Sequence, residues 1–213
     1  MFVPSEVTRY IESLIRDREP ALKEMELYAK EHGVPIMELV GIETMLHLLR
    51  LLKPKAILEI GTAIGYSAIR MAKELPHAKI VTIERDRSRY EIALENIKKV
   101  NLEKQITVIY GDALEVEAEV QEYGPYDCLF IDAAKGQYRR FFEIYSSHLS
   151  ANGVVFSDNV LFKGFVANDN VDNKRHQTMV NKIKAYNEWL MTHPDFDTMI
   201  LTVGDGIAIS SKR

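Results

Sequence analysis

Residues 58–67 constrain the fold most, because they place two glycines directly after a short apolar run. They read Leu-Glu-Ile-Gly-Thr-Ala-Ile-Gly-Tyr-Ser. Gly61 and Gly65 permit a tight turn and a close approach of the backbone to a ligand. A helix that begins at such a turn directs its free N–H groups toward that ligand. The stretch therefore predicts a strand, a glycine turn and a helix that form a nucleotide-type site at the carboxyl edge of a parallel sheet.

From residue 55 onward, short apolar runs alternate with segments of helical periodicity. The predicted strands are residues 56–60, 79–84, 106–110, 126–131 and 153–157, and the helices between them are residues 66–75, 87–100, 114–123 and 138–149. The strand cores are continuously apolar, as in residues 129–131, which is typical of strands covered on both faces. The pattern predicts a Rossmann-like α/β fold with a mostly parallel seven-stranded sheet.

The two ends of the chain depart from this alternation. Helical patterns over residues 7–15, 20–32 and 36–52 predict an N-terminal helical cap, which is also a candidate homodimer surface. After a predicted helix over residues 177–192, Gly204-Asp205-Gly206 separates two apolar runs, as in an antiparallel hairpin. We expect one domain over residues 1–213, with the cap at 1–53 and a Rossmann-like core at 54–213.

Composition excludes several classes of function. A net charge of −4 argues against a surface that coats nucleic acid, although a local basic patch is compatible with it. Cys128 is the single cysteine, which rules out an internal disulfide and a cysteine-based zinc site. We expect neither a signal peptide nor a transmembrane segment, and therefore a cytoplasmic protein that does not contact membranes.

The spacing of the glycines favours a ligand without a pyrophosphate. Ala63 stands where dinucleotide-binding turns carry a middle glycine. Glu84 ends the second strand, 23 residues after Gly61, where an acid can bind both hydroxyls of a ribose. Asp112 and Ala113 follow the third strand and are candidates to flank an adenine, although Asp112 is equally a candidate helix cap. These residues favour S-adenosylmethionine over a nicotinamide cofactor.

Oxygen-bearing side chains follow the next two strands. Asp132 follows the fourth strand, and Asp158 and Asn159 follow the fifth. The carboxyl ends of parallel strands share one edge, and oxygen ligands without histidine or cysteine suit a hard divalent cation such as Mg²⁺. Lys135, three residues after Asp132, is a candidate base for a reacting hydroxyl and equally a candidate solvated lysine.

Together these motifs resemble the metal-dependent O-methyltransferases of the catechol and caffeoyl-CoA type. The resemblance covers nearly the whole chain, from residues 58–67 to the terminal hairpin. It implies that S-adenosylmethionine is bound by Met37, Val40, Glu59, Gly61, Ser67, Glu84, Asp112, Ala113 and Asp132. It implies that Mg²⁺, or another hard divalent cation, is bound by Asp132, Asp158 and Asn159. Lys135 and Asp132 would be the catalytic residues.

Residues 64–70, 135–138 and 159–164 look most like a bacterial group within this family. That group methylates 5-hydroxyuridine in the tRNA anticodon loop to 5-methoxyuridine. We therefore expect tRNA as the substrate and partner, with candidate phosphate contacts at Arg139, Arg140 and Lys163. The polar residues 167–173 are a candidate lid.

Two alternatives to a tRNA substrate remain open. The O5 hydroxyl and C4 carbonyl of 5-hydroxyuridine form a vicinal pair, as the two oxygens of a catechol do. One metal geometry therefore suits both, and a small catechol or phenylpropanoid is the alternative acceptor. A non-catalytic nucleotide-binding module is the alternative from another class.

Overall fold

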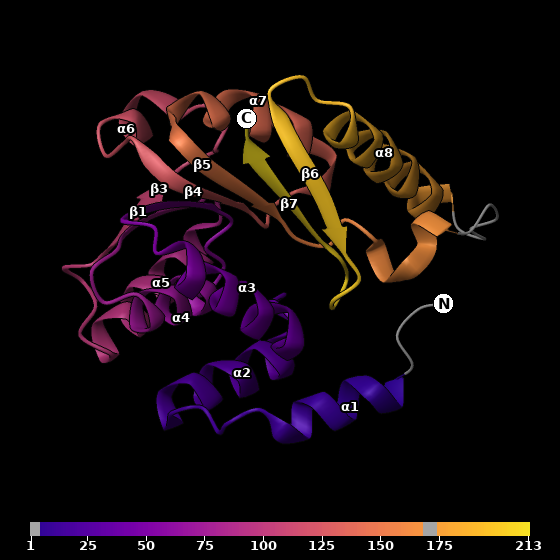
Figure 1. The fold of residues 1–213 in the computed structure, drawn as a ribbon. Helices are drawn as coiled ribbons and strands as arrows, with labels where there is room; N and C mark the ends of the chain where they lie inside the picture. Colours follow the sequence, from indigo (N-terminus) through magenta and orange to yellow (C-terminus); the bar gives the residue numbers. More distant parts are fainter. Residues whose placement is uncertain (1–4, 168–173) are drawn as a thin grey trace.

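The computed structural model describes residues 5–167 and 174–213, without the side chain of Arg175, and contains a seven-stranded sheet between two layers of helices (Figure 1). The strands are β1 (Ala56–Ile60), β2 (Lys79–Glu84), β3 (Ile106–Tyr110), β4 (Tyr126–Ile131), β5 (Leu149–Ser157), β6 (Phe196–Leu201) and β7 (Ile207–Lys212). The helices are α1 (Ser5–Leu14), α2 (Pro20–His32), α3 (Leu39–Leu52), α4 (Tyr66–Glu74), α5 (Arg87–Lys99), α6 (Glu117–Gln121), α7 (Tyr138–Tyr145) and α8 (Lys174–Met191). Apart from residue 167, the candidate lid lies outside the described residues.

The strand order of the sheet is β3-β2-β1-β4-β5-β7-β6. Strands β1 to β5 pair in parallel, whereas β7 runs antiparallel to both β5 and β6. The predicted fold class, including the terminal hairpin, is confirmed. The order reverses between β1 and β4, and open α/β sheets bind their ligands outside the carboxyl ends of the strands at such a point.

Each face of the sheet carries its own hydrophobic core, because successive strand residues point to opposite faces. Ile57 of β1 belongs to the core under α2, α3, α4 and α5. Leu58 and Ile60 belong to the core under α6, α7 and α8. Both faces are therefore covered, as the continuous apolar runs predict.

Several element boundaries differ from the prediction. Helix α3 begins at Leu39 and not at residue 36, because Glu38 has an extended backbone with ψ 148°, so Met37 precedes the helix. Helix α6 begins only at Glu117, because residues 112–116 form a turn in which the Glu115 and Val116 N–H groups donate to the Asp112 carbonyl. Strand β5 begins at Leu149, where it pairs with Tyr126.

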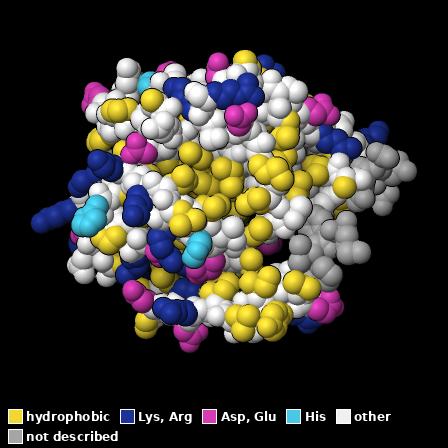
Figure 2. Space-filling view, viewed as in Figure 1, with side chains coloured by type: hydrophobic (Ala, Val, Ile, Leu, Met, Phe, Trp, Pro, Cys, Tyr) yellow, Lys and Arg dark blue, Asp and Glu magenta, His cyan; other side chains and the backbone are white. Residues whose placement is uncertain are grey.

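Helix α1 lies at the bottom of the view in Figure 1 and has no buried residue. Its apolar side chains Val7, Tyr10, Ile11 and Leu14 are exposed by 38% to 65%, and Figure 2 shows hydrophobic side chains gathered at this lower edge of the molecule. They are therefore not core residues, and the predicted homodimer surface stays a prediction. No helix in the described parts of the chain is long and apolar enough to span a membrane.

Candidate active site

The glycine turn joins β1 to α4 and passes directly against the end of β4. Gly61 has φ +107°, and a Cβ built on it would lie 2.1 Å from the backbone oxygen of Asp132. Only glycine fits there, because any side chain would meet backbone as well as adopt an unfavourable φ. The Asp132 N–H also donates to the Ile60 carbonyl at 2.9 Å. The turn and the first acid of the predicted metal site are thus held together by backbone.

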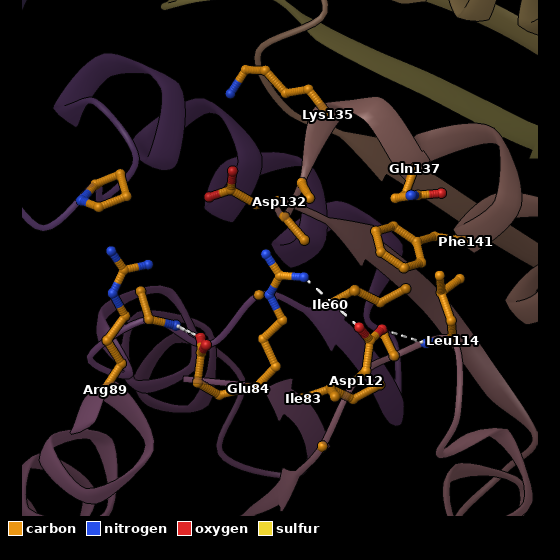
Figure 3. Close-up of a pocket in the computed structure, with 18 of the residues that line it drawn as sticks. Ile60, Ile83, Glu84, Arg89, Asp112, Leu114, Asp132, Lys135, Gln137 and Phe141 are labelled. Atoms are coloured by element: carbon orange, nitrogen blue, oxygen red, sulfur yellow. Dashed lines mark hydrogen bonds and ion pairs between the residues drawn. The ribbon is translucent and has the colours of Figure 1, made fainter. Parts of the chain in front are cut away.

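A cavity of about 330 Å³ opens at this edge of the sheet, and Figure 3 shows the residues that line it. We call it the donor cavity. Its polar lining includes Glu84, Asp112 and Asp132. Its apolar lining comprises Ile60, Ile83, Ala113, Leu114, Phe141, Pro35 and residues of the glycine turn. An apolar wall with a few convergent polar groups is typical of a cofactor site, and the volume suits a nucleoside-sized ligand.

The Glu84 carboxylate faces the donor cavity and also braces the turn. One oxygen accepts from the Ala63 N–H at 2.8 Å and the other from the Asp86 N–H at 2.8 Å. Ala63 has φ +47°, which is uncommon for a residue with a side chain, so the carboxylate supports a strained backbone. Glu84 therefore has a structural role beside its predicted contact with a ribose.

Asp112 and Ala113 line the donor cavity at the end of β3. The Asp112 carboxylate accepts from the Leu114 N–H at 2.9 Å and lies 3.7 Å from the Arg85 guanidinium. Asp112 therefore stabilises its own turn and does not cap α6, whose N-cap residue is Val116. The predicted adenine-flanking position and a local turn role coexist at Asp112.

Glu59 and Ser67 lie beneath the turn and do not line the donor cavity. The Glu59 carboxyl is fully buried and accepts from the hydroxyls of Ser67 and Thr82. Burial raises the pKa of Glu59 to about 7, and those two hydrogen bonds oppose the rise. These residues support the turn from the side of the sheet.

Met37 and Val40 also lie outside the lining of the donor cavity. Met37 is buried, and its Cε lies 3.5 Å from a Cβ built on Gly41. Val40 lines a second cavity of about 280 Å³, which we call the hairpin cavity because residues 202–205 of the β6–β7 hairpin line it. Neither residue lines the donor cavity, and their contact with the cofactor stays a prediction.

Asp132, Asp158 and Asn159 meet where the adjacent strands β4 and β5 end. The Asp158 N–H donates to the Ile131 carbonyl at 3.1 Å, and the Asn159 amide donates to the Asp158 carboxylate at 3.1 Å. The Lys135 ammonium donates to the side-chain oxygen of Asn159. Burial raises the pKa of both carboxyls, the charge of Asp132 raises that of Asp158 further, and Lys135 opposes both shifts.

This cluster fits a hard divalent cation. It offers two carboxylates and one amide, all with oxygen donors. Among the described residues, no group of three or more His, Cys, Asp or Glu side chains is placed to hold a metal ion, so the amide of Asn159 is needed to complete this set. The carboxylates of Asp132 and Asp158 repel each other in a poorly solvated place, so a bound cation would be favourable there. Asn159 has φ +57°, a left-handed conformation that asparagine adopts more readily than most residues with a side chain.

The predicted contacts to tRNA do not gather around the donor cavity. Arg139 on α7 pairs with Glu143 at 2.8 Å and lies over the Trp189 ring. Arg140 donates to Gln137 at 3.2 Å, and Lys163 lines the hairpin cavity. Both arginines lie on the exposed side of α7, and Arg140 touches the donor cavity only through Gln137, so their contact with tRNA stays a prediction.

Two arginines that sequence reasoning missed, Arg85 and Arg89, do line the donor cavity. Figure 3 shows Arg89 at its rim, and Arg85 pairs with Asp112. The available signal was position, because Arg85 directly follows β2 and Arg89 lies in the first turn of α5. A turn after a strand that ends in a ligand-binding acid lies at the same carboxyl edge.

This sheet topology, the glycine turn and the acids at the strand ends define a Rossmann-like methyltransferase. The chain belongs to the O-methyltransferase family, whose model matches residues 12–213. It is 32% identical over 215 residues to a catechol O-methyltransferase of Niastella koreensis, covering 96% of this chain and 95% of that protein.

Two solved structures are similar over nearly their whole length. A Staphylococcus aureus protein provisionally described as a caffeoyl-CoA O-methyltransferase is 37% identical, with a TM-score of 0.91 over 96% of this chain and 98% of that one. An O-methyltransferase of Bacillus cereus in complex with SAH is 25% identical, with a TM-score of 0.84 over 98% of this chain and 97% of that one.

Proposed function

We propose that this protein transfers a methyl group from S-adenosylmethionine to one hydroxyl of a small catechol-type phenol. The observation that carries the proposal is the position of Asp132, which lines the donor cavity and meets Asp158 and Asn159 at the same edge. The names of the similar proteins support this acceptor class, because they include a catechol and a caffeoyl-CoA O-methyltransferase. The SAH complex of a similar structure supports the donor.

The residues divide between the two reactants. Glu84 would bind the ribose of the donor, while Ala113, Leu114 and Phe141 would pack against its adenine. The apolar cavity walls exclude water, which favours a reaction between an oxygen anion and a sulfonium cation. Holding both reactants in line lowers the barrier further.

The polar cluster would prepare the attacking oxygen. Asp132, Asp158 and Asn159 would hold Mg²⁺, which, when bound, lowers the pKa of a coordinated hydroxyl and fixes its orientation. The Lys135 ammonium, which donates to Asn159, stands beside this cluster. It would stabilise the acceptor oxygen as an anion, and in its neutral form it would accept the hydroxyl proton at Nζ.

A tRNA with 5-hydroxyuridine is the second candidate acceptor. The observation that favours it is the basic lining of the donor cavity by Arg85, Arg89 and Lys135, since an RNA acceptor brings phosphates to the active edge. An additional lysine, Lys182 of α8, has its Nζ 3.3 Å from a Cβ built on Gly136. Three of these basic groups line the donor cavity, and Lys182 lies near Gly136, next to Lys135 in the sequence.

Parallel assays with labelled S-adenosylmethionine would separate the two acceptors. One assay would use catechols with Mg²⁺, and the other would use tRNA that carries 5-hydroxyuridine, taken from cells that lack only the final O-methylation. We expect label in the catechols and none in tRNA; label in tRNA alone would contradict the small-phenol assignment. Asp132→Asn should be inactive with either substrate, and Asp195→Asn, at an exposed acid, serves as the matched control.

A further inference from the structure

The hairpin cavity lies beside the polar cluster of Asp132, Asp158 and Asn159. The donor cavity lies on one side of this cluster, and the hairpin cavity lies on another. Asn159 lines the donor cavity, and Leu161, two residues later, lines the hairpin cavity. The segment between them is tied to the hairpin, because the Leu161 N–H donates to the Asp205 carbonyl at 2.8 Å and the Val160 N–H donates to the Gly206 carbonyl at 3.0 Å. This short segment therefore separates the two cavities.

In-line methyl transfer requires the donor and the acceptor on opposite sides of the moving carbon. The donor cavity holds one partner, so the acceptor must approach from beyond Asp158 and Asn159. The hairpin cavity is the neighbouring space on that side, and the charge of its lining residue Asp205 raises the pKa of Asp158. It is thus placed to receive the part of the acceptor that extends from the reacting ring.

The lining of the hairpin cavity has a definite chemical character. Ile11, Val40 and Leu161 make it apolar, and Glu38, Asp205 and Lys163 are its charged members. Within the described residues, none of these three charged side chains takes part in a hydrogen bond or an ion pair. Two acids and one lysine give the cavity a negative balance, so a carboxylate or phosphate would be repelled more than it is attracted.

The Glu38 carboxylate is directed across the hairpin. A Cβ built on Gly204 would lie 3.4 Å from Glu38 Oε2, so the absence of a side chain at Gly204 leaves room for this carboxylate. Burial raises the pKa of Glu38, the charges of Asp205 and Glu12 raise it further, and the charge of Lys163 opposes these shifts without reversing them. A cationic group between Glu38 and Asp205 would relieve this repulsion.

We propose that the hairpin cavity holds the ring substituent of the acceptor and that Glu38 and Asp205 select a neutral or cationic substituent over an anionic one. The inference rests on the proposed function, because it assigns the substrate class of the same active site. It predicts poor turnover of acceptors with a carboxylate or a phosphate-bearing tail.

Three catechols with the same reacting ring test the proposal. Dopamine carries an ammonium, 4-methylcatechol is neutral, and 3,4-dihydroxyphenylacetate carries a carboxylate. We expect kcat/KM for dopamine to exceed that for 3,4-dihydroxyphenylacetate by about 10-fold, which corresponds to a free-energy difference of about 1.4 kcal/mol. In Glu38→Gln/Asp205→Asn, this ratio should fall about 5-fold or more through KM, whereas in Lys163→Met it should rise.

The control variant is Glu103→Gln, which removes one exposed acid between α5 and β3 and should leave the ratio unchanged. Equal kcat/KM values for the three catechols in the wild type would overturn the proposal. A ratio that does not move in the double variant would do the same.

Binding of two probes without catechol oxygens separates this proposal from the proposed function. Phenethylamine and phenylacetate differ in charge and cannot chelate a metal, and saturation-transfer NMR measures their binding directly. Stronger binding of phenethylamine, lost in Glu38→Gln/Asp205→Asn, would support charge selection by the cavity. If none of the three catechols is methylated while that preference persists, the proposed function is wrong and the cavity's selectivity stands.

Discussion

The hydroxyl of Ser67, in the first turn of α4, donates a hydrogen bond to the fully buried carboxyl of Glu59 in β1. Thr82, the β2 partner of Glu59 in the sheet register, donates to the other oxygen of the same carboxyl at 2.5 Å. One acid therefore joins two strands and a helix directly beneath the glycine turn. The turn above this buried contact lines the donor cavity.

Replacing Glu59 by glutamine should change how stability depends on pH. Burial raises the folded-state pKa of Glu59 from 4.5 to about 7, so the stability contributed by its neutral form is full below about pH 4.5 and is lost as pH rises through about 7. A shift of this size corresponds to about 3 kcal/mol across that range. Glu59→Gln stays neutral and should gain stability relative to the wild type between pH 5 and pH 8, as measured by urea unfolding.

The exposed Glu103→Gln variant is the control, and its stability should follow the wild type at every pH. A constant difference between Glu59→Gln and the wild type from pH 5 to pH 8 would show that Glu59 does not titrate in this range. That result would contradict the raised pKa of Glu59.

Removing Asp132 or Asp158 should abolish stabilisation by magnesium. A ligand that binds only the folded state at 100 times its Kd adds about 2.7 kcal/mol, or about 5–10 °C in Tm for a protein of this size. We expect this rise for the wild type in MgCl₂ and none for Asp132→Asn or Asp158→Asn, with activity reduced about 100-fold or more. Scanning calorimetry measures the rise in Tm. Asp195→Asn is the control variant and should keep the full rise.

Glu84→Gln should lose stability even without any ligand. Both carboxylate oxygens accept backbone N–H groups, and an amide would direct its own N–H₂ toward one of them. Loss of a hydrogen bond to a charged group costs about 1.5–3 kcal/mol. Urea unfolding of the free protein and calorimetric binding of S-adenosylhomocysteine separate the two roles. Weaker binding with unchanged stability would mean that Glu84 does not brace the turn.

The sequence predicted those parts of the fold that depend on local pattern. The boundaries of β1 to β4 agree with the apolar runs at residues 56–60, 79–84, 106–110 and 126–131. The starts of α2, α4, α5 and α7 also agree with the prediction. Helices α3 and α6 begin later than predicted, because Glu38 is extended before α3 and the turn at Asp112 delays α6. Strand-end residues such as Asp132 were identified because parallel topology alone brings them to one edge.

The remaining features of the site have no local signature. Glu59 was expected at the ligand, but its side chain shares a sheet face with Ile57 and lies beneath the turn. The hairpin cavity combines Ile11, Val40, Leu161 and residues 202–205, which are far apart in the sequence. Such a space depends on how α1 contacts α3 and on where the hairpin lies, and no short motif in the sequence predicts it.

Gly61→Ala should be far more destabilising than Gly33→Ala, although both positions have positive φ. Gly33 follows the end of α2 with φ +64°, and a Cβ there would meet nothing within 4 Å, so alanine should cost about 1–2 kcal/mol. At Gly61, with φ +107°, the Cβ would lie 2.1 Å from the Asp132 oxygen. Because backbone cannot yield as a side chain can, we expect a loss above about 3 kcal/mol in urea unfolding. The same variant should fail to bind S-adenosylhomocysteine, whereas Gly33→Ala should bind it normally; equal costs at the two positions would refute the close approach of the turn to β4.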